Sequence, residues 1–275
     1  MPNRIALEIP DELSNPLNYA VHQRGRDILD TVRAALKHGE VRLAYQPIVE
    51  AQRPDRIGFY EGLFRVLDAD GRVIPARDFM PFAEDCDIGR DIDCSALEIG
   101  LTALSQVPGL RLSVNMSARS IGYPRWMQVL ERKLADDPDI GARLILEITE
   151  TSAMTVPELV QPFMRKLRAH GVAFALDDFG AGATSFRYLR DLRFDMVKID
   201  QQFCRNAHRN RDDQALIRAM SLIADQFDMM TIAEGVENAG AANWLRDAGL
   251  HCLQGYHFSL PQLRPDWTTP ARQRA

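Results

Sequence analysis

The sequence lacks the features that mark membrane-spanning and secreted proteins. It has no run of about eighteen consecutive apolar residues, so no segment is expected to cross a membrane. Residues 1–17 carry acids and prolines where a signal peptide needs an apolar stretch. Cysteine is scarce, and the four that occur show no CxxC spacing and no accompanying histidine run: Cys86, Cys94, Cys204 and Cys252. We therefore expect reduced thiols and a cytoplasmic protein without a zinc knuckle or a redox dithiol.

A basic excess is also lacking. Lys and Arg number 33 against 38 Asp and Glu, which gives a formal net charge of −5 over 275 residues. Proteins that coat a nucleic-acid polymer or an anionic membrane carry surplus basic residues, so neither partner is expected. A small anionic substrate stays compatible, because a few local cations or bound metal ions can reverse the charge of a pocket. With 46% hydrophobic and 26% charged residues, and no Gly/Ser linker, the chain is expected to fold as one domain.

Short apolar or β-branched segments alternate with amphipathic segments along most of the chain. Strands are predicted at residues 43–49, 57–66, 110–117, 143–149, 172–177, 195–200, 230–235 and 252–259. Helices are predicted from 24 to 39 and at 93–107, 123–137, 158–171, 213–227 and 240–249. This rhythm predicts a TIM-like (β/α)8 barrel, with a doubly wound open sheet as the alternative. Only residues 50–56 separate the first two strands, too few for a helical crossover, so that pair is predicted to be antiparallel.

The two ends of the chain lack the alternating pattern of strands and helices that its centre shows. Residues 1–23 are interpreted as an irregular lead-in, because Pro2, Pro10 and Pro16 interrupt any regular element. The barrel domain is predicted over residues 24–265, followed by a tail over 266–275. Since the lead-in is too short for a folded sensor, regulation is expected from a protein partner, from oligomerisation or from expression.

Polar side chains recur in and after the predicted strands. Taken singly, an aspartate or asparagine after a strand is usually a helix cap, and a lone lysine in a strand usually reaches solvent. Repetition across seven strands is not explained in that way, because the carboxyl ends of barrel strands converge on one mouth. The residues concerned are Glu61, Arg65, Asn115, Glu147, Asp177, Asp178, Lys198, Glu234 and Gln254.

Such a gathering of acids needs a cation. Carboxylates at one mouth repel one another and raise each other's pKa unless positive charge neutralises them. Carboxylate and amide oxygens suit magnesium or manganese better than zinc. The adjacent Asp177 and Asp178 allow one carboxylate to bridge two metal ions, the arrangement used for in-line phosphoryl displacement. Because Lys198 and Arg65 add positive charge for phosphate oxygens, the site is predicted to act on a phosphate ester.

The motifs around these residues resemble those of the EAL domain, the cyclic-di-GMP-specific phosphodiesterase family. The resemblance runs from about residue 24 to 262. It rests on YQPIV (45–49), YEGLFR (60–65), FMPFAE (79–84), VNMS (114–117), LEITET (146–151), ALDDFGAG (175–182), VKID (197–200), IAEGVEN (232–238) and LQGYHFS (253–259).

This resemblance implies hydrolysis of one phosphodiester bond of cyclic di-GMP to linear pGpG, with two divalent ions, Mg²⁺ or Mn²⁺. The ligands that it implies for the two ions are Glu61, Asn115, Glu147 and Asp177 for one, and Asp177 with Asp178 for the other, with Glu234 close by. The implied catalytic residues are Lys198, which orients the attacking water, Glu234, which assists as base or metal partner, and Glu61. The implied substrate contacts are Gln46, Arg65, Asp178 and Gln254. Glu150, which braces the loop after Asp178, and Glu237 are implied to support the loops.

The sequence departs from the family pattern at two places. The name-giving Glu-Ala-Leu is Glu61-Gly62-Leu63, which keeps the carboxylate and mainly loosens the strand. The loop that follows the paired aspartates differs at Ala181, Ala183 and Thr184, and in the family this loop couples metal binding to dimerisation. We expect activity, and a reduced rate if that coupling is weakened.

Two alternatives to this enzyme remain open. A receptor that binds cyclic di-GMP without cutting it and signals to a protein partner is the first, although receptors of this family typically lose a metal ligand or the lysine, and none is lost here. A barrel hydrolase for another phosphate ester is the second. A homodimer is expected from the resemblance.

Overall fold

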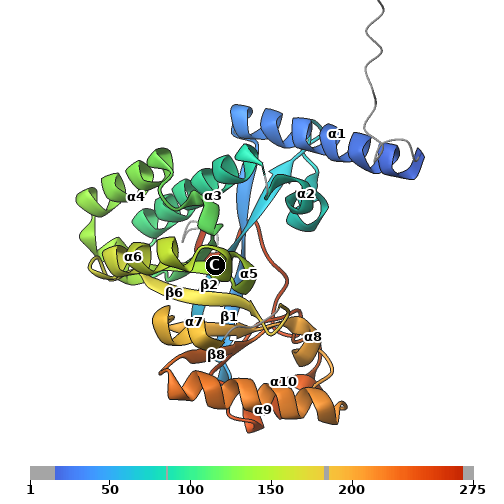
Figure 1. The fold of residues 1–275 in the computed structure, drawn as a ribbon, viewed down its shortest axis with the longest axis vertical. Helices are drawn as coiled ribbons and strands as arrows, with labels where there is room; N and C mark the ends of the chain where they lie inside the picture. Colours follow the sequence, from blue (N-terminus) through green and yellow to red (C-terminus); the bar gives the residue numbers. More distant parts are fainter. Residues whose placement is uncertain (1–15, 85, 183–185, 269–275) are drawn as a thin grey trace, which may run out of the picture.

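A computed structural model describes residues 16–84, 86–182 and 186–268 of the chain (Figure 1). Its strands are β1 (Val41–Glu50), β2 (Arg53–Leu67), β3 (Val73–Pro75), β4 (Leu112–Asn115), β5 (Leu144–Thr149), β6 (Ala173–Phe179), β7 (Met196–Ile199), β8 (Met230–Ala233) and β9 (Cys252–Leu253). Its α-helices are α1 (Pro16–His38), α2 (Ala76–Ala83), α3 (Asp87–Gln106), α4 (Pro124–Asp136), α5 (Glu150–Thr155), α6 (Pro157–Arg168), α7 (Phe186–Asp191), α8 (Gln201–Cys204), α9 (Arg211–Gln226) and α10 (Ala239–Asp247). Three short 3₁₀ helices are η2 (Ala118–Ser120), η3 (Pro138–Arg143) and η4 (Asp266–Thr268).

The strands close into a barrel. Their order is β1-β9-β8-β7-β6-β5-β4-β2, and β2 pairs with β1 to complete the ring, while β3 adds to the outer part of β2. All pairs from β2 through β9 round the ring are parallel, whereas β1 runs antiparallel to both of its neighbours. The predicted TIM-like barrel with an antiparallel first strand pair is therefore confirmed.

Two details at the ends of the chain differ from the sequence-based prediction. The first helix begins at Pro16, earlier than Arg24, and so crosses the expected boundary of the lead-in. Proline is tolerated in the first turn of a helix, where its missing N–H would have no partner. The last strand ends at Leu253 because Gln254 turns away to pair its backbone with Ala233 and Val236, so the segment expected over 252–259 is mostly irregular.

Helices pack on the outside of the ring through the apolar face that their sequence pattern predicts. Trp126 of α4 lies 5.6 Å from Phe163 of α6, and Phe163 lies 6.0 Å from Phe174 of β6, measured between ring centroids. This chain of aromatic contacts fixes α4 and α6 against the strand that carries the paired aspartates. Figure 1 shows α1 at one end of the molecule and α9 with α10 at the other.

The barrel interior has an apolar layer directly below a polar one. Successive residues of a strand point to opposite faces, so residues two apart point the same way. An apolar cluster fills the barrel, and six of its residues each stand two positions before a polar residue of the mouth, while Ile48 of the antiparallel β1 stands two positions after Gln46. These pairs are Phe59 with Glu61, Ile145 with Glu147, Ala175 with Asp177, Met196 with Lys198, Ile232 with Glu234 and Cys252 with Gln254. The polar side chains of the mouth thus stand on a packed apolar floor that excludes water from below.

Two further predictions from the opening composition can be compared with the structure. All four cysteines are free, and Cys86 alone among them is exposed. In the part of the chain that the structure describes, none of the helices is both long enough and apolar enough to span a bilayer.

Candidate active site

The carboxyl ends of the parallel strands surround a cavity of about 1290 Å³. Glu61 of β2 and Asn115 of β4 reach it from one side, and Asp177 of β6 and Lys198 of β7 from the other. Gln46 belongs to the antiparallel β1, and its register places it directly opposite Glu61 on β2. The mouth therefore gathers polar residues from widely separated parts of the sequence.

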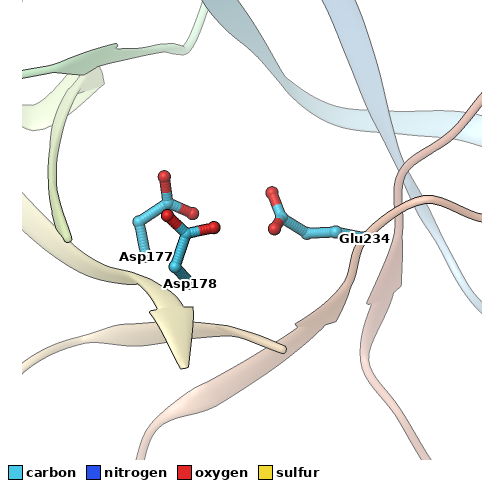
Figure 2. Close-up of side chains that lie close together, drawn as sticks. All are labelled: Asp177, Asp178 and Glu234. Carbon is cyan, nitrogen blue, oxygen red and sulfur yellow. The ribbon is translucent and has the colours of Figure 1, made fainter. Parts of the chain in front are cut away.

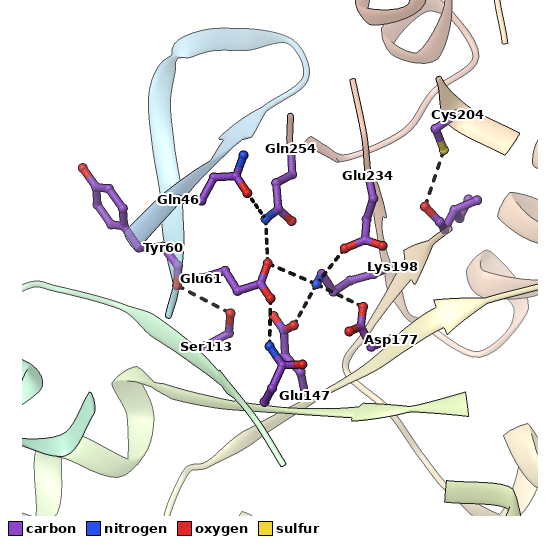
Figure 3. Close-up of polar contacts among 12 residues, drawn as sticks. Gln46, Tyr60, Glu61, Ser113, Glu147, Asp177, Lys198, Cys204, Glu234 and Gln254 are labelled. Atoms are coloured by element: carbon purple, nitrogen blue, oxygen red, sulfur yellow. Dashed lines mark hydrogen bonds and ion pairs between the residues drawn. The ribbon is translucent and has the colours of Figure 1, made fainter. Parts of the chain in front are cut away.

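Lys198 stands at the centre of this mouth. Its Nζ lies 2.7 Å from Glu147, 2.8 Å from Glu234, 3.0 Å from Asp177 and 3.3 Å from Glu61 (Figure 3). The lysine side chain is 1% exposed, so water screens these contacts poorly. Four carboxylates against one ammonium leave a buried excess of negative charge.

Three side-chain donors hold the Glu61 carboxylate in place. Gln254 Nε2 donates to Oε2 at 2.6 Å, Lys198 Nζ donates to the same oxygen at 3.3 Å, and Asn115 Nδ2 donates to Oε1 at 2.8 Å. Burial would raise the pKa of Glu61, but the charge of Lys198 and the donors from Gln254 and Asn115 outweigh it and lower that pKa. Glu61 is thus fixed as a carboxylate, and the Gln254 amide that binds it also donates to Gln46 Oε1 at 3.0 Å.

Two glutamates of the cluster, Glu147 and Glu234, hold their protons more tightly than usual. Burial, followed by the charge of Glu61, raises the pKa of Glu147 to about 8, although Lys198 opposes the rise. Burial likewise raises the pKa of Glu234 well above its usual value. For Lys198 burial would lower the pKa, but the four carboxylates outweigh it and keep the ammonium charged. One lysine is therefore too little positive charge for this set of acids.

Asp177, Asp178 and Glu234 form a second cluster beside the first. One oxygen from each lies within 4.8 Å of the others, and Figure 2 shows Glu234 pointing at the two aspartates from the opposite side. Asp178 adopts a left-handed backbone with φ of 55°, which turns its side chain into the mouth beside that of Asp177. Burial, followed by the charges of Asp177 and Asp200, raises the pKa of Asp178 to about 6.

These residues fit divalent metal ions. The donors are carboxylate and amide oxygens, which are the ligands of magnesium and manganese. Glu147 Oε1 and Gln254 Oε1 are buried acceptors without a hydrogen-bond partner in the described structure, which is costly unless a cation or a polar ligand reaches them. A divalent ion would also offset the excess negative charge around Lys198.

The other residues singled out in the sequence have different environments. Arg65 is half-buried, lines the cavity and donates from Nη1 to the backbone oxygen of Phe64 at 2.9 Å. Glu150 is 2% exposed, and its Oε2 accepts from the Gly180 backbone N–H at 3.0 Å. Glu237 lines the cavity from an exposed position and pairs with Arg205 at 3.0 Å.

A model of the EAL domain matches residues 29–261, which is most of the chain. The chain belongs to the EAL domain family. It is 31% identical over 237 residues to the cyclic di-GMP phosphodiesterase PdeB of Shewanella oneidensis, a match that covers 84% of this chain and 28% of that protein. It is 28% identical over 239 residues to the cyclic di-GMP phosphodiesterase PdeF of Escherichia coli, covering 86% of this chain and 32% of that protein. The chain thus spans about a third or less of the length of these curated relatives.

Solved EAL structures have the same fold. The PaMucR phosphodiesterase in its c-di-GMP complex superposes with a TM-score of 0.75 at 28% identity, covering 90% of this chain and 100% of that one. The EAL domain of FimX from Xanthomonas citri, in complex with c-diGMP, superposes with a TM-score of 0.76 at 26% identity, covering 86% and 94%. Both matches extend across the barrel that carries the mouth.

The two departures from the EAL pattern can now be placed. A Cβ at Gly62 would lie 3.0 Å from a Leu43 side-chain carbon and 3.2 Å from the Ser113 backbone oxygen, so glycine here permits close packing of β2 between its neighbours. Ala181 is exposed in the turn after β6, and its N–H donates to Asp178 O at 3.0 Å. Ala183 and Thr184 lie outside the described residues.

Sequence reasoning missed three residues of this EAL mouth. Asp200 caps α8 by accepting from the Gln202 N–H at 2.6 Å, and its charge acts on Asp178. The VKID motif at residues 197–200 could have indicated Asp200 from the sequence. Arg205 follows five residues later and lines the cavity. Asp93 is 6% exposed within the apolar face of α3. Its signal is a carboxylate on the buried stripe of an amphipathic helix, hidden because the helix was expected to begin at residue 93 rather than Asp87.

Proposed function

We propose that this chain is a metal-dependent phosphodiesterase that hydrolyses cyclic di-GMP to linear pGpG. The observation that carries the proposal is the position of Lys198, whose ammonium lies within 3.3 Å of four carboxylates beside the Asp177–Asp178 pair. The complete set of acids and the lysine matches what hydrolysis of a phosphate ester requires. The relatives PdeB and PdeF, which are named for this activity, support the choice of substrate.

Two groups of residues would hold the metal ions. The first comprises Glu61, Asn115, Glu147 and Asp177, and the second comprises Asp177 and Asp178 with Glu234. Mg²⁺ or Mn²⁺ bound there would lower the pKa of a bound water and offset negative charge on the phosphate oxygens.

The chain's own residues would provide the remaining chemistry. Lys198 can donate a hydrogen bond to the attacking water or to a phosphate oxygen, because its Nζ faces the cavity from the strand end. Glu234, whose carboxylate lies 2.8 Å from Lys198 Nζ, is placed to accept the proton of that water. Arg65 can bind a phosphate, and the Gln46–Gln254 amide pair can orient the nucleotide or the Glu61 carboxylate.

Product analysis tests the proposal. Purified protein is incubated with cyclic di-GMP and either Mg²⁺ or Mn²⁺, and the nucleotides are separated by chromatography. We expect linear pGpG from the wild type, no product after metal chelation, and none from Glu61→Ala. Glu131→Ala is a matched control, since Glu131 is exposed and pairs with Lys166 on the outer surface. Calcium should inhibit, because it prefers a larger and more flexible coordination shell.

Tight binding of cyclic di-GMP with no turnover under either metal would instead establish the receptor function. The expected homodimer, regulatory partner and cytoplasmic location, and the domain limits 24–265, are parts of the same proposal. Light scattering on the eluted protein, with and without Mn²⁺, tests the dimer by its mass. A monomer with full turnover would show that dimerisation is not required for activity.

A further inference from the structure

Asp93 is a buried carboxylate outside the groups assigned above. It lies within α3, and the neighbouring positions Gly89, Ala96 and Leu97 on the same helix face are also buried. At 6% exposed, Asp93 borders the cavity with little access to bulk water. A buried carboxylate is costly unless it is hydrogen-bonded, so its hydrogen-bond partners indicate its role.

Both partners of Asp93 Oδ2 belong to one turn. The Ser117 backbone N–H donates to it at 2.9 Å, and the fully buried Ser120 hydroxyl donates at 2.6 Å. The partners are a backbone amide and a hydroxyl rather than a cation, so the carboxylate is held without a compensating charge. Burying a carboxylate without a compensating charge lowers the stability of the fold. What the protein gains in return is a fixed geometry of the turn.

That turn begins directly after Asn115, the amide at the end of β4. Three consecutive backbone N–H groups leave the strand and bind three different elements: Met116 N–H donates to Glu147 O of β5, Ser117 N–H to Asp93 of α3, and Ala118 N–H to Ser152 Oγ of α5. The backbone after β4 is thereby clamped between the barrel and two helices. Of the three accepting groups, a backbone carbonyl, a carboxylate and a hydroxyl, the Asp93 carboxylate is the one that titrates in the physiological range.

These three hydrogen bonds also affect Asn115, because they fix the path of the backbone that follows it. Asn115 is the last residue of β4, two positions before Ser117, so its side-chain direction follows the path of the turn. Its Nδ2 donates to Glu61 Oε1 at 2.8 Å, so the amide oxygen is the atom of this side chain that could coordinate a cation. A displaced turn would therefore move both the amide oxygen and a support of Glu61.

We infer that Asp93 is a positioning residue, which anchors the turn after β4 and thereby orients the Asn115 amide toward the cation that the mouth would hold. The inference rests on the proposed function for the identity of that cation, and on the described contacts for the anchoring itself. It adds to the site a residue from α3, which contributes none of the ligands.

The test compares three variants with the wild type. Asp93→Asn retains an oxygen that can accept from both the Ser117 N–H and the Ser120 hydroxyl, whereas Asp93→Leu has similar size and no polar side-chain atom. Asp91→Asn is the matched control, because Asp91 lies on the same helix and pairs with Arg125 of α4 at 3.0 Å. Hydrogen exchange of the amides from 116 to 121 and the Asn115 side-chain NMR signals are measured without metal or nucleotide. Mn²⁺ affinity is then measured by calorimetry.

For Asp93→Leu we expect at least tenfold faster exchange in this segment, shifted Asn115 side-chain signals, and at least tenfold weaker Mn²⁺ binding. Asp93→Asn should stay within threefold of the wild type in both measurements, and Asp91→Asn should match it. Wild-type exchange and unshifted Asn115 signals in a folded Asp93→Leu protein would overturn the inference. An Asp93→Asn protein as impaired as Asp93→Leu would do the same.

A second variant covers the case in which Asp93→Leu does not fold. Ser120→Ala removes one of the two donors and should speed exchange in the segment at least threefold, and unchanged exchange there would overturn the inference. Failure of the proposed function is visible separately. A wild type that neither binds Mn²⁺ nor cuts cyclic di-GMP refutes the enzyme, while exchange and the Asn115 signals still decide the role of Asp93.

Discussion

Lys198 Nζ lies 2.7 Å from Glu147 Oε2 inside the barrel, with the two side chains 1% and 0% exposed. Removing one partner of a buried ion pair leaves an uncompensated charge, which typically costs about 3–5 kcal/mol. Lys198→Met keeps approximately the length of the side chain and removes the charge together with the N–H donors of the ammonium. We therefore expect a loss of about that size in the free energy of unfolding, measured by urea denaturation in a metal chelator, together with loss of phosphodiesterase activity.

The matched control for this change is Lys166→Met. Lys166 pairs with Glu131 at 2.8 Å as well, but the two side chains are 56% and 52% exposed. Exposed pairs of this kind contribute about 0–1 kcal/mol. Equal losses in the two variants would contradict the view that burial, rather than the short distance, makes the Lys198 contacts strong.

Gln254 provides a second prediction, because its single amide group donates to both Gln46 and Glu61. Gln254→Ala removes the 2.6 Å donor of Glu61 and takes from the buried Gln46 amide oxygen the donor that satisfies it, and an unpaired buried group of this kind costs about 1–3 kcal/mol. We expect kcat/KM for cyclic di-GMP to fall at least tenfold, measured by initial rates of pGpG formation. Gln262→Ala is the control, since the Gln262 side chain is exposed near the same loop. Full activity of Gln254→Ala would refute an orienting role for this amide.

Much of the mouth follows from the alternation of side chains along a strand. Ile145 and Glu147 are two apart on β5, so an apolar residue in the barrel floor implies that the glutamate stands above it. The sequence alone therefore allows the convergence of Glu147 and Asp177 to be predicted once a barrel is assumed. The interior position of Lys198 among the carboxylates needs the closed ring, because its four partners come from strands that are distant in sequence.

Other parts of the site could not be predicted because their signals are weak. Strand β9 has two residues, so its period is too short to recognise, and Gln254 was placed inside a strand that had already ended. Asp93 looked like the start of a helix, because an aspartate before an apolar run usually marks one. Its burial depends on how α3 lies against the turn after β4, which is tertiary structure that no local pattern encodes.

Asp93 also predicts a dependence of stability on pH. Burial is the largest influence on this carboxyl and raises its pKa to about 7, although the donors Ser120 and Ser117 oppose the rise. A raised pKa means that the folded protein binds a proton more tightly than the unfolded chain. The contribution of Asp93 to stability is therefore present at low pH and is lost as pH rises from about 4 to about 7.

The measurement for Asp93 is the difference in free energy of unfolding between the wild type and Asp93→Asn. We expect this difference to shift against the wild type by more than about 1 kcal/mol between pH 4 and pH 7, and to be level above pH 8. Because Asp93→Asn removes only this titration, the other carboxylates cancel in the comparison. A difference that is constant over this range would show that Asp93 titrates normally.

Gly255 gives the last prediction, which links backbone packing to the mouth. Val236 N–H donates to Gln254 O at 2.9 Å, and a Cβ at Gly255 would overlap the backbone atoms of Val236. Gly255→Ala must therefore separate the segments that carry Glu234 and Gln254, and overpacking of this kind costs about 1–3 kcal/mol. We expect lower stability and at least a tenfold loss of kcat, whereas Gly58→Ala, whose Cβ would meet its nearest atom at 3.5 Å, should leave both unchanged. Unaltered turnover in Gly255→Ala would mean that the mouth tolerates movement between these two segments, and that the close backbone approach serves the fold alone.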